Sequence, residues 1–219
     1  STAALTETDA AQSTGGTLTA TDPDSSNAFV AQTDVAGSNG YGKFSIDAAG
    51  VWTYTMDSAH NEFVGGTDYT DSITVATADG TSQVITVTMH GTDDATVITG
   101  SSTAALTEAN VAQSTGGTLV ATDPDSSAAF VAQSNVAGSN GYGKFSIGTD
   151  GVWTYTMDSA HNEFVAGTDY TDTITVKTAD GTSQVITVTM TGSDDATVIT
   201  GSSTAALTET DAAQSTGGT

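Results

Sequence analysis

Hydrophobic residues alternate with Thr and Ser between residues 42 and 57. Five of them, Phe44, Ile46, Trp52, Tyr54 and Met56, fall on even positions, and the Thr and Ser residues largely fall between them. A period of two puts alternate side chains on one face of a strand, so this face is predicted to be buried. The turn-forming residues 47–50 separate the two halves, which predicts a hairpin.

Further short runs of the same kind predict more strands. They cover residues 3–7, 17–21, 29–35, 73–77 and 84–89. In the last hairpin the side chains expected to face inward are Ile73, Val75, Ile85, Val87 and Met89. Residues 57–63 are expected to form one helical turn capped by Ser58. About seven strands with turn signals between them predict an all-β, Ig-like sandwich.

The pattern recurs along the chain. Leu5, Leu106 and Leu207 occupy equivalent places, as do Trp52 and Trp153, which gives a repeat of 101 residues (153 − 52 = 101). A unit of this length is one domain of roughly 100 residues rather than a solenoid repeat. We therefore expect tandem sandwiches joined end to end: repeat 1 over residues 1–94, repeat 2 over 95–195, and the start of a truncated third repeat over 196–219.

Composition narrows the function. The chain has 26 Asp and Glu against three Lys and no Arg, and its formal net charge is −23. It lacks the basic surface that nucleic acids and anionic membranes require, so neither is an expected partner, and no run is apolar enough to insert into a membrane. The absence of Cys excludes disulfides and thiolate metal sites. Acid-rich chains can be disordered, but the alternating runs favour a folded core.

Strand direction predicts where the acids gather. If strands alternate up and down, the upper pole of each sandwich carries Asp22, Asp24 and Asp79, and the lower pole carries the chain exit at Asp93 and Asp94. End-to-end stacking then brings the lower pole of repeat 1 to the upper pole of repeat 2. The candidate metal ligands of both repeats are Glu7, Asp22, Asp24, Asp68, Asp71, Asp79, Asp93, Asp94, Glu108, Asp123, Asp125, Asp169, Asp172, Asp180, Asp194 and Asp195.

Such a joint favours Ca²⁺. Two like charges about 4 Å apart cost on the order of 4 kcal/mol at an effective dielectric near 20, and no cationic side chain is expected at the poles. Sites rich in oxygen and free of sulfur select Ca²⁺, whereas Mg²⁺ demands stricter octahedral geometry. The alternative is that each Asp is a solvated turn residue. Against this, the candidate acids recur after 101 residues, while Asp9, Asp34 and Asp47 become Asn110, Asn135 and Gly148.

Four motifs resemble the VCBS/cadherin-like tandem repeats of bacterial RTX adhesins, including biofilm and ice-binding adhesins. They are residues 16–24 (GTLTATDPD), 42–57 (GKFSIDAAGVWTYTMD), 78–81 (ADGT) and 91–95 (GTDDA). The resemblance implies a calcium-bound Ig-like sandwich that extends a terminal adhesive domain away from the cell. By resemblance, ligands fall on Asp123 and Asp125, on Asp93 and Asp94, and on Asp180.

We therefore expect a non-enzymatic extender module of a secreted adhesin at the bacterial cell surface. Its partners would be the adjacent repeats of the same chain, and the molecule would be a monomeric rod. The alternative is that the repeats themselves bind carbohydrate or surface ligands, with copies adding avidity. An acid hydrolase would need paired carboxylates in a cleft, which a sandwich end does not obviously offer.

Two features suggest other chemistry. His60 and His161 lie beside acids in sequence, but a catalytic site would also need a nucleophile and a third positioned group, so a loop role is favoured. Trp52 and Tyr54 could form a sugar-stacking platform, but their even spacing favours burial in the core.

Overall fold

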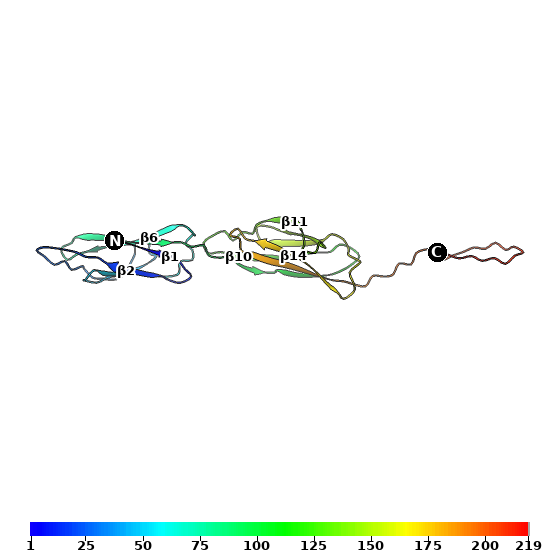
Figure 1. Ribbon diagram of the computed structural model, residues 1–219, viewed down its shortest axis with the longest axis horizontal. Helices are drawn as coiled ribbons and strands as arrows, with labels where there is room; N and C mark the ends of the chain where they lie inside the picture. The colour runs from blue at the N-terminus through cyan, green and yellow to red at the C-terminus, as the bar shows by residue number, and fades with distance from the viewer. Residues whose placement is uncertain (219) are drawn as a thin grey trace.

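The computed structural model describes residues 1–218 and contains strands, turns and loops but no helix over that range. Two β-sandwiches lie end to end along the long axis, and the chain continues past the second as an extended segment (Figure 1). No helix among the described residues is available to cross a lipid bilayer.

Repeat 1 contributes seven strands. They are β1 (Thr2–Thr6), β2 (Ser13–Thr17), β3 (Gln32–Ala36), β4 (Gly42–Ile46), β5 (Val51–Met56), β6 (Asp68–Ala76) and β7 (Ser82–His90). One sheet has the order β1-β7-β6 and the other β2-β5-β4-β3. β1 runs parallel to β7, with Thr2 opposite Thr86, and the other pairings are antiparallel.

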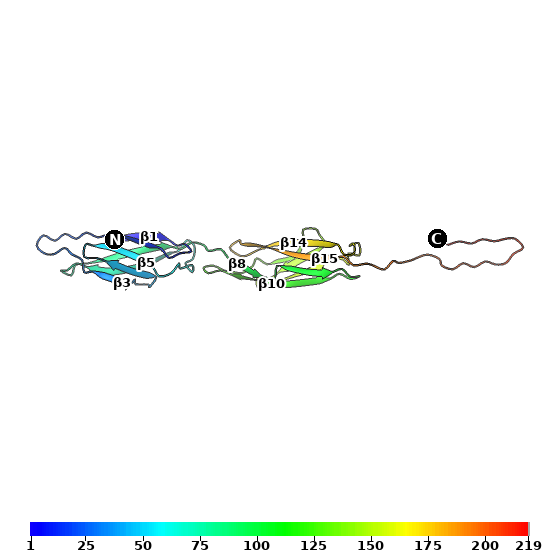
Figure 2. The same ribbon diagram turned by 90° about the horizontal axis from the view of Figure 1, so that it is seen from below.

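Repeat 2 contributes eight strands. They are β8 (Val97–Gly100), β9 (Thr103–Thr107), β10 (Ser114–Thr122), β11 (Gln133–Ala137), β12 (Gly143–Ile147), β13 (Val152–Met157), β14 (Asp169–Lys177) and β15 (Ser183–Thr191). Its sheets have the orders β14-β15-β9 and β11-β12-β13-β10-β8. The additional strand, β8, lies at the edge of the second sheet, as the view from below makes clear (Figure 2).

Each sandwich closes over its own hydrophobic core. All ten side chains predicted to face inward in repeat 1 are buried, and so are their counterparts in repeat 2. Trp52 is 2% exposed and Tyr54 is 0% exposed, which confirms that they belong to the core rather than to a surface platform. The all-β sandwich is therefore confirmed, and period two located its inner faces.

Three local predictions were wrong. Residues 57–63 form turns instead of a helical turn, because His60 adopts a left-handed backbone with φ of 58°. The strand expected at 17–21 is β2, which covers Ser13–Thr17 in repeat 1, whereas its counterpart β10 continues to Thr122. The expected strand over 29–35 begins at Gln32, and Phe29 contributes only an isolated bridge to Thr77.

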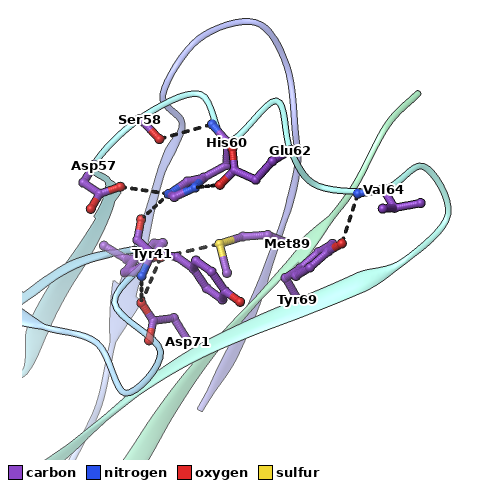
Figure 3. A network of polar contacts seen from close by, with 10 residues as sticks. Tyr41, Asp57, Ser58, His60, Glu62, Val64, Tyr69, Asp71 and Met89 are labelled. Atoms are coloured by element: carbon purple, nitrogen blue, oxygen red, sulfur yellow. Dashed lines mark hydrogen bonds and ion pairs between the residues drawn. The ribbon is translucent and has the colours of Figure 1, made fainter. Parts of the chain in front are cut away.

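His60 holds its loop through both ring nitrogens (Figure 3). Nδ1 lies 2.7 Å from Glu62 Oε1, and Nε2 lies 2.9 Å from the Tyr41 carbonyl and 2.8 Å from Asp57 Oδ1. The ring also stacks on Phe63 with centroids 4.8 Å apart. Burial lowers the pKa of His60, but the hydrogen bonds to Glu62 and to the Tyr41 carbonyl outweigh it, and the pKa is raised. When the imidazole is protonated, its two N–H groups face these three acceptors.

This raised pKa predicts a pH-dependent stability. The contribution of His60 is fully present below the unfolded pKa of about 6.5 and is lost as the pH rises through the folded value. We expect the melting temperature to fall over that window. The combined substitution Glu62→Gln and Glu163→Gln, which removes the carboxylate from both repeats, should flatten the profile. Equal slopes in thermal unfolding of the two proteins from pH 5 to 9 would contradict this assignment.

Candidate metal centre at the joint between repeats

Glu7, Asn61 and Asp94 converge on an open groove of about 600 Å³ at the lower pole of repeat 1. Glu7 follows the last residue of β1, and its N–H donates to the carbonyl of His90 at the end of β7. Asp94 lies where the chain leaves that sheet, and Asn61 comes from the loop after β5. Asp9 and Pro124 also line the groove, so both repeats contribute to it.

Each of the three converging side chains buries an oxygen that has no hydrogen-bond donor. These atoms are Glu7 Oε1, Asn61 Oδ1 and Asp94 Oδ2. Glu7 is only 1% exposed, and its other carboxylate oxygen accepts hydrogen bonds from the backbone N–H and the hydroxyl of Thr92. A buried acceptor left unpaired costs about 1–3 kcal/mol, and more when it is charged. The joint therefore contains a polar site that the protein's own donors do not satisfy.

The pKa of Asp94 reflects this lack of hydrogen-bond donors. Burial, the charges of Glu7 and Asp9, a hydrogen bond to Asp9 that only the protonated acid can donate, and the charge of Asp125 together raise the pKa of Asp94 to about 6. An acid whose folded pKa lies above its unfolded value weakens the fold once it ionises. At neutral pH the joint is thus under strain from its own negative charge.

The upper pole of repeat 2 reaches the same linker with carboxylates. Asp125 accepts from the N–H of Gly65 at 3.3 Å and of Asp94 at 3.4 Å. Thr96, which is 4% exposed, donates its N–H to Asp180 Oδ2 at 3.1 Å and its hydroxyl to Asp123 Oδ2 at 2.7 Å. Linker and upper pole are therefore joined directly by hydrogen bonds.

The Asp123 and Asp180 carboxylates also build their own turns. Asp123 Oδ1 accepts from the N–H of Asp125 at 3.2 Å and of Ser126 at 2.7 Å. The hydrogen bond from Thr96, followed by those from Ser126, lowers the pKa of Asp123, and hydroxyl donors from Thr178 and Thr182 lower that of Asp180. The turn-residue interpretation therefore describes part of what these acids do.

The oxygen atoms that line the groove fit a hard cation. It consists of carboxylate and amide oxygens with unsatisfied lone pairs, which is the ligand type that Ca²⁺ prefers. No three His, Cys, Asp or Glu side chains among residues 1–218 stand together as a finished metal site. The two carboxylates and one amide of the groove are thus an incomplete set, and further ligands would have to come from Asp9, Asp93, Asp125 or water.

Several predicted ligands lie elsewhere. Asp22 and Asp79 lie at the upper pole of repeat 1, away from this joint, and accept local turn hydrogen bonds, as Asp22 does from the N–H of Asp24. Asp68 is exposed and pairs with His90, while Asp169 accepts from the Thr191 hydroxyl at 2.7 Å. Neither Asp68 nor Asp169 contacts the groove.

Asp71 and Asp172 are core residues of their own repeats, each 0% exposed. Asp71 accepts from the N–H of Tyr41 at 3.1 Å (Figure 3). It also accepts from the N–H of Asn39 at 2.8 Å and from the hydroxyl of Tyr54 at 3.2 Å. A side chain at Gly37 would lie 2.1 Å from this carboxylate. In the structure this aspartate organises a loop inside its own repeat and does not line the groove, so its role as a joint ligand stays a prediction.

We expect Asp71→Asn to lower the free energy of unfolding of repeat 1 by about 2–3 kcal/mol, because charged acceptors make the stronger hydrogen bonds and an amide group would face N–H donors. Asp172→Asn is the matched change in repeat 2. Chemical denaturation with Ca²⁺ and with chelator should give the same loss. A loss confined to the calcium condition would instead make Asp71 a metal ligand.

The far end of repeat 2 contains the counterparts of Glu7 and Asp94, which are Glu108 and Asp195. Glu108 is 2% exposed, and Glu108 Oε1 and Asp195 Oδ2 are again buried without a donor. Ser193 takes the place of Thr92, with its N–H and hydroxyl on Glu108 Oε2. The Glu–Asp pair is thus built by each repeat alone.

Two groove residues were absent from the predicted ligands. Asn61 is not among them, since the predicted ligands are all Asp or Glu, although it recurs as Asn162. Asp9 was set aside because it becomes Asn110 in the next repeat. The recurrence of Asn61 in both repeats was the one available signal.

Comparison with known proteins supports the fold. Residues 93–192 match the family described as bacterial cadherin-like domain. The match spans one copy of the repeat, from the acid pair to the glycine after β15. No protein of curated function matches the chain in sequence.

The chain is also similar to solved cadherin structures, at low identity. Mouse cadherin-23 EC22–24 is 20% identical, with 87% of this chain and 62% of that chain covered and a TM-score of 0.45. The human desmocollin-1 ectodomain is 18% identical, with 90% of this chain and 36% of that chain covered and a TM-score of 0.33. Drosophila N-cadherin EC1–3 is 14% identical, with 89% of this chain and 64% of that chain covered and a TM-score of 0.35. The chain spans less than two thirds of each.

Proposed function

We propose that this chain is a pair of non-enzymatic extender modules of a large secreted adhesin. In this role the repeats project a terminal adhesive domain from a bacterial cell surface, and Ca²⁺ at each joint stiffens the array. The bacterial cadherin-like match over residues 93–192 supports the adhesin setting, and the end-to-end arrangement supports the spacer role.

The unsatisfied oxygens of the joint carry the calcium part of the proposal. Glu7, Asn61 and Asp94 would hold the ion from repeat 1, and Asp125 is the carboxylate of repeat 2 that lies against the same linker. The three lysines of the chain all lie outside the groove, so none of them neutralises it. A bound divalent cation would supply the missing positive charge. With it, the carboxylates of the two repeats attract a common centre instead of repelling one another.

Without the ion, the same residues favour bending. The hydrogen bonds from Gly65 and Asp94 to Asp125 are long, at 3.3 and 3.4 Å, and repulsion between Asp94 and Asp125 opposes them. We therefore expect small-angle X-ray scattering of this chain to show a longer and narrower particle in Ca²⁺ than in chelator. A maximum dimension and melting temperature that do not change between the two would reject calcium as the stiffening agent.

Asp94→Asn provides a sharper test, with Asp195→Asn as its matched control. At Kd values of about 10⁻⁴–10⁻³ M, about 10 mM Ca²⁺ should stabilise a site by roughly 1–3 kcal/mol. Asp94→Asn should raise the melting temperature in chelator, because it removes a strained charge, and should abolish the calcium-dependent lengthening. Asp195→Asn should keep that lengthening, because Asp195 belongs to the far pole of repeat 2. Equal behaviour of both variants would contradict an ion at this joint.

The carbohydrate-binding alternative gains no support from the surface. Both Trp residues are buried, and the large exposed apolar side chains of the described residues are Val, Ile and Leu. Sugar stacking relies on exposed aromatic faces, which this surface does not present.

A further inference from the structure

Asn39 and Asn140 are each followed by a glycine, and these are the two Asn-Gly pairs of the sequence. Glycine has no side chain to shield its backbone nitrogen or to limit its rotation, so that nitrogen can reach the amide carbon of the preceding asparagine. This attack closes a succinimide ring and begins spontaneous deamidation. Both pairs lie in exposed loops, where Gly40 and Gly141 each have a φ of 77°. Each repeat therefore carries a chemically reactive pair on its surface.

The conformation of the loop in repeat 1 engages the groups that would react. The attacking group, the N–H of Gly40, donates to the Gly37 carbonyl at 3.1 Å. The leaving group, Asn39 Nδ2, donates to the Thr70 carbonyl at 2.6 Å. The N–H of Asn39 itself donates to Asp71 Oδ1 at 2.8 Å and fixes the residue between the two. The attack therefore requires the loop to open first.

Repeat 2 holds its pair in the same way. The N–H of Gly141 donates to the Gly138 carbonyl at 3.1 Å, and Asn140 Nδ2 donates to the Thr171 carbonyl at 2.6 Å. The N–H of Asn140 donates to Asp172 Oδ1 at 2.7 Å. The closed loop is thus a property of the repeat, and it depends on the buried aspartate that the loop folds over.

Asn39 also fastens the outer edge of β6, which is the last strand of its sheet. Donors from residues 30–39 cover this edge, and residues 131–140 cover β14 in the same way. Four carbonyls of β6 accept these hydrogen bonds: Thr70 from Asn39 Nδ2 at 2.6 Å, Ser72 from the N–H of Ser38 at 2.9 Å, Thr74 from Gln32 Nε2 at 3.4 Å and Ala76 from the N–H of Val30 at 2.9 Å. An uncovered strand edge can pair with another chain, so this cover protects the sheet.

We propose that Asn39 and Asn140 are sites of spontaneous deamidation that the native loop keeps closed, and that their conversion unfastens the outer edges of β6 and β14. In the reaction the Gly40 nitrogen bonds to Asn39 Cγ and the Cγ–Nδ2 bond breaks. The proton of the Gly40 N–H leaves with Nδ2 as ammonia. Water then adds to one of the two succinimide carbonyls and opens the ring, which leaves aspartate or isoaspartate.

The product cannot fasten the edge as asparagine does. A carboxylate accepts hydrogen bonds and does not donate them, so it offers nothing to the Thr70 carbonyl. It also adds a negative charge beside Asp71, with which it shares the loop. In isoaspartate the main chain runs through the former side chain, which lengthens the loop. The modified loop therefore loses part of its hold on β6.

The first test is the deamidation rate of the full chain in heavy-oxygen water at mildly alkaline pH, folded and in denaturing urea. Heavy oxygen marks each product, and mass spectrometry after digestion in ordinary water assigns it to a residue. We expect Asn39 and Asn140 to react about 10–1,000 times more slowly in the folded chain, because two or three hydrogen bonds must open first. Equal rates in the two states would overturn the closed site, and no product at either residue in urea would overturn the site itself.

Ser38→Ala tests whether the loop controls the rate. The Ser38 hydroxyl accepts from the N–H of Ser72 at 3.2 Å and from the Ser72 hydroxyl at 3.0 Å, so its loss loosens the loop on β6 without touching the core. We expect the ratio of the folded to the denatured rate to rise about 2–10-fold at Asn39 and to stay unchanged at Asn140 in the same molecules. Ser139→Ala should do the reverse. Ratios that change equally at both residues, or at neither, would overturn control by the loop.

Asn140→Asp imitates the product, and Asn135→Asp is its matched control. Both add one negative charge to repeat 2, but Asn135 is exposed and repeat 1 already carries Asp34 at that place. The readout is amide hydrogen exchange, measured by NMR, at the N–H of Ser139, which donates to the Thr173 carbonyl at 3.0 Å. We expect exchange about 2–10-fold faster in Asn140→Asp and unchanged in Asn135→Asp. The same rate in both variants would show that Asn140 does not fasten the edge and would overturn the proposed consequence.

Discussion

Each repeat ends in negative charge that it buries and does not neutralise. The glutamate after the first strand and the aspartate after the last come together because those strands run parallel and adjacent, as β1 and β7 do in repeat 1. Each leaves one oxygen without a donor. Burying an unpaired charge is among the most costly arrangements in a protein, and this cost is the basis for proposing a cation at the lower pole.

The linker at the joint contacts both sandwiches. Asp94 belongs to the groove of repeat 1, whereas Thr96, two residues later, is buried against Asp123 and Asp180, and β8 then enters a sheet of repeat 2. A linker this short, fixed at both ends, couples the orientation of one sandwich to that of the next. Under the proposed calcium binding, the charge in the groove would set whether this coupling is strained or relaxed.

Local pattern in the sequence was enough to predict the sandwich and its core, because alternation places a side chain on a face regardless of which strand lies beside it. The role of Asp71 could not be predicted this way. Its burial depends on the loop of residues 37–41 folding over it, which is a contact between segments some 30 residues apart. The left-handed backbone of His60 likewise follows from acceptors brought from Tyr41 and Asp57.

For the acids at the joint, too, the sequence predicted some features, whereas others depend on contacts made only in the fold. Sequence placed Asp93, Asp94 and the Asp123–Asp125 turn together, but charge counting missed Asn61, whose amide oxygen is as unsatisfied as its carboxylate neighbours. Nor did it show that Asp123 and Asp180 are already engaged by N–H and hydroxyl donors. Ligand capacity depends on which lone pairs remain free, and only the fold determines that.

A carbon-13 NMR titration of the Asp94 carboxyl group tests this account most directly. Without calcium it should titrate near the raised pKa of about 6, and with saturating Ca²⁺ its pKa should fall well below that value because the bound ion favours the carboxylate. An Asp94 that titrates like an ordinary exposed aspartate and does not respond to Ca²⁺ would show that the joint holds no unpaired charge, and the account would fail.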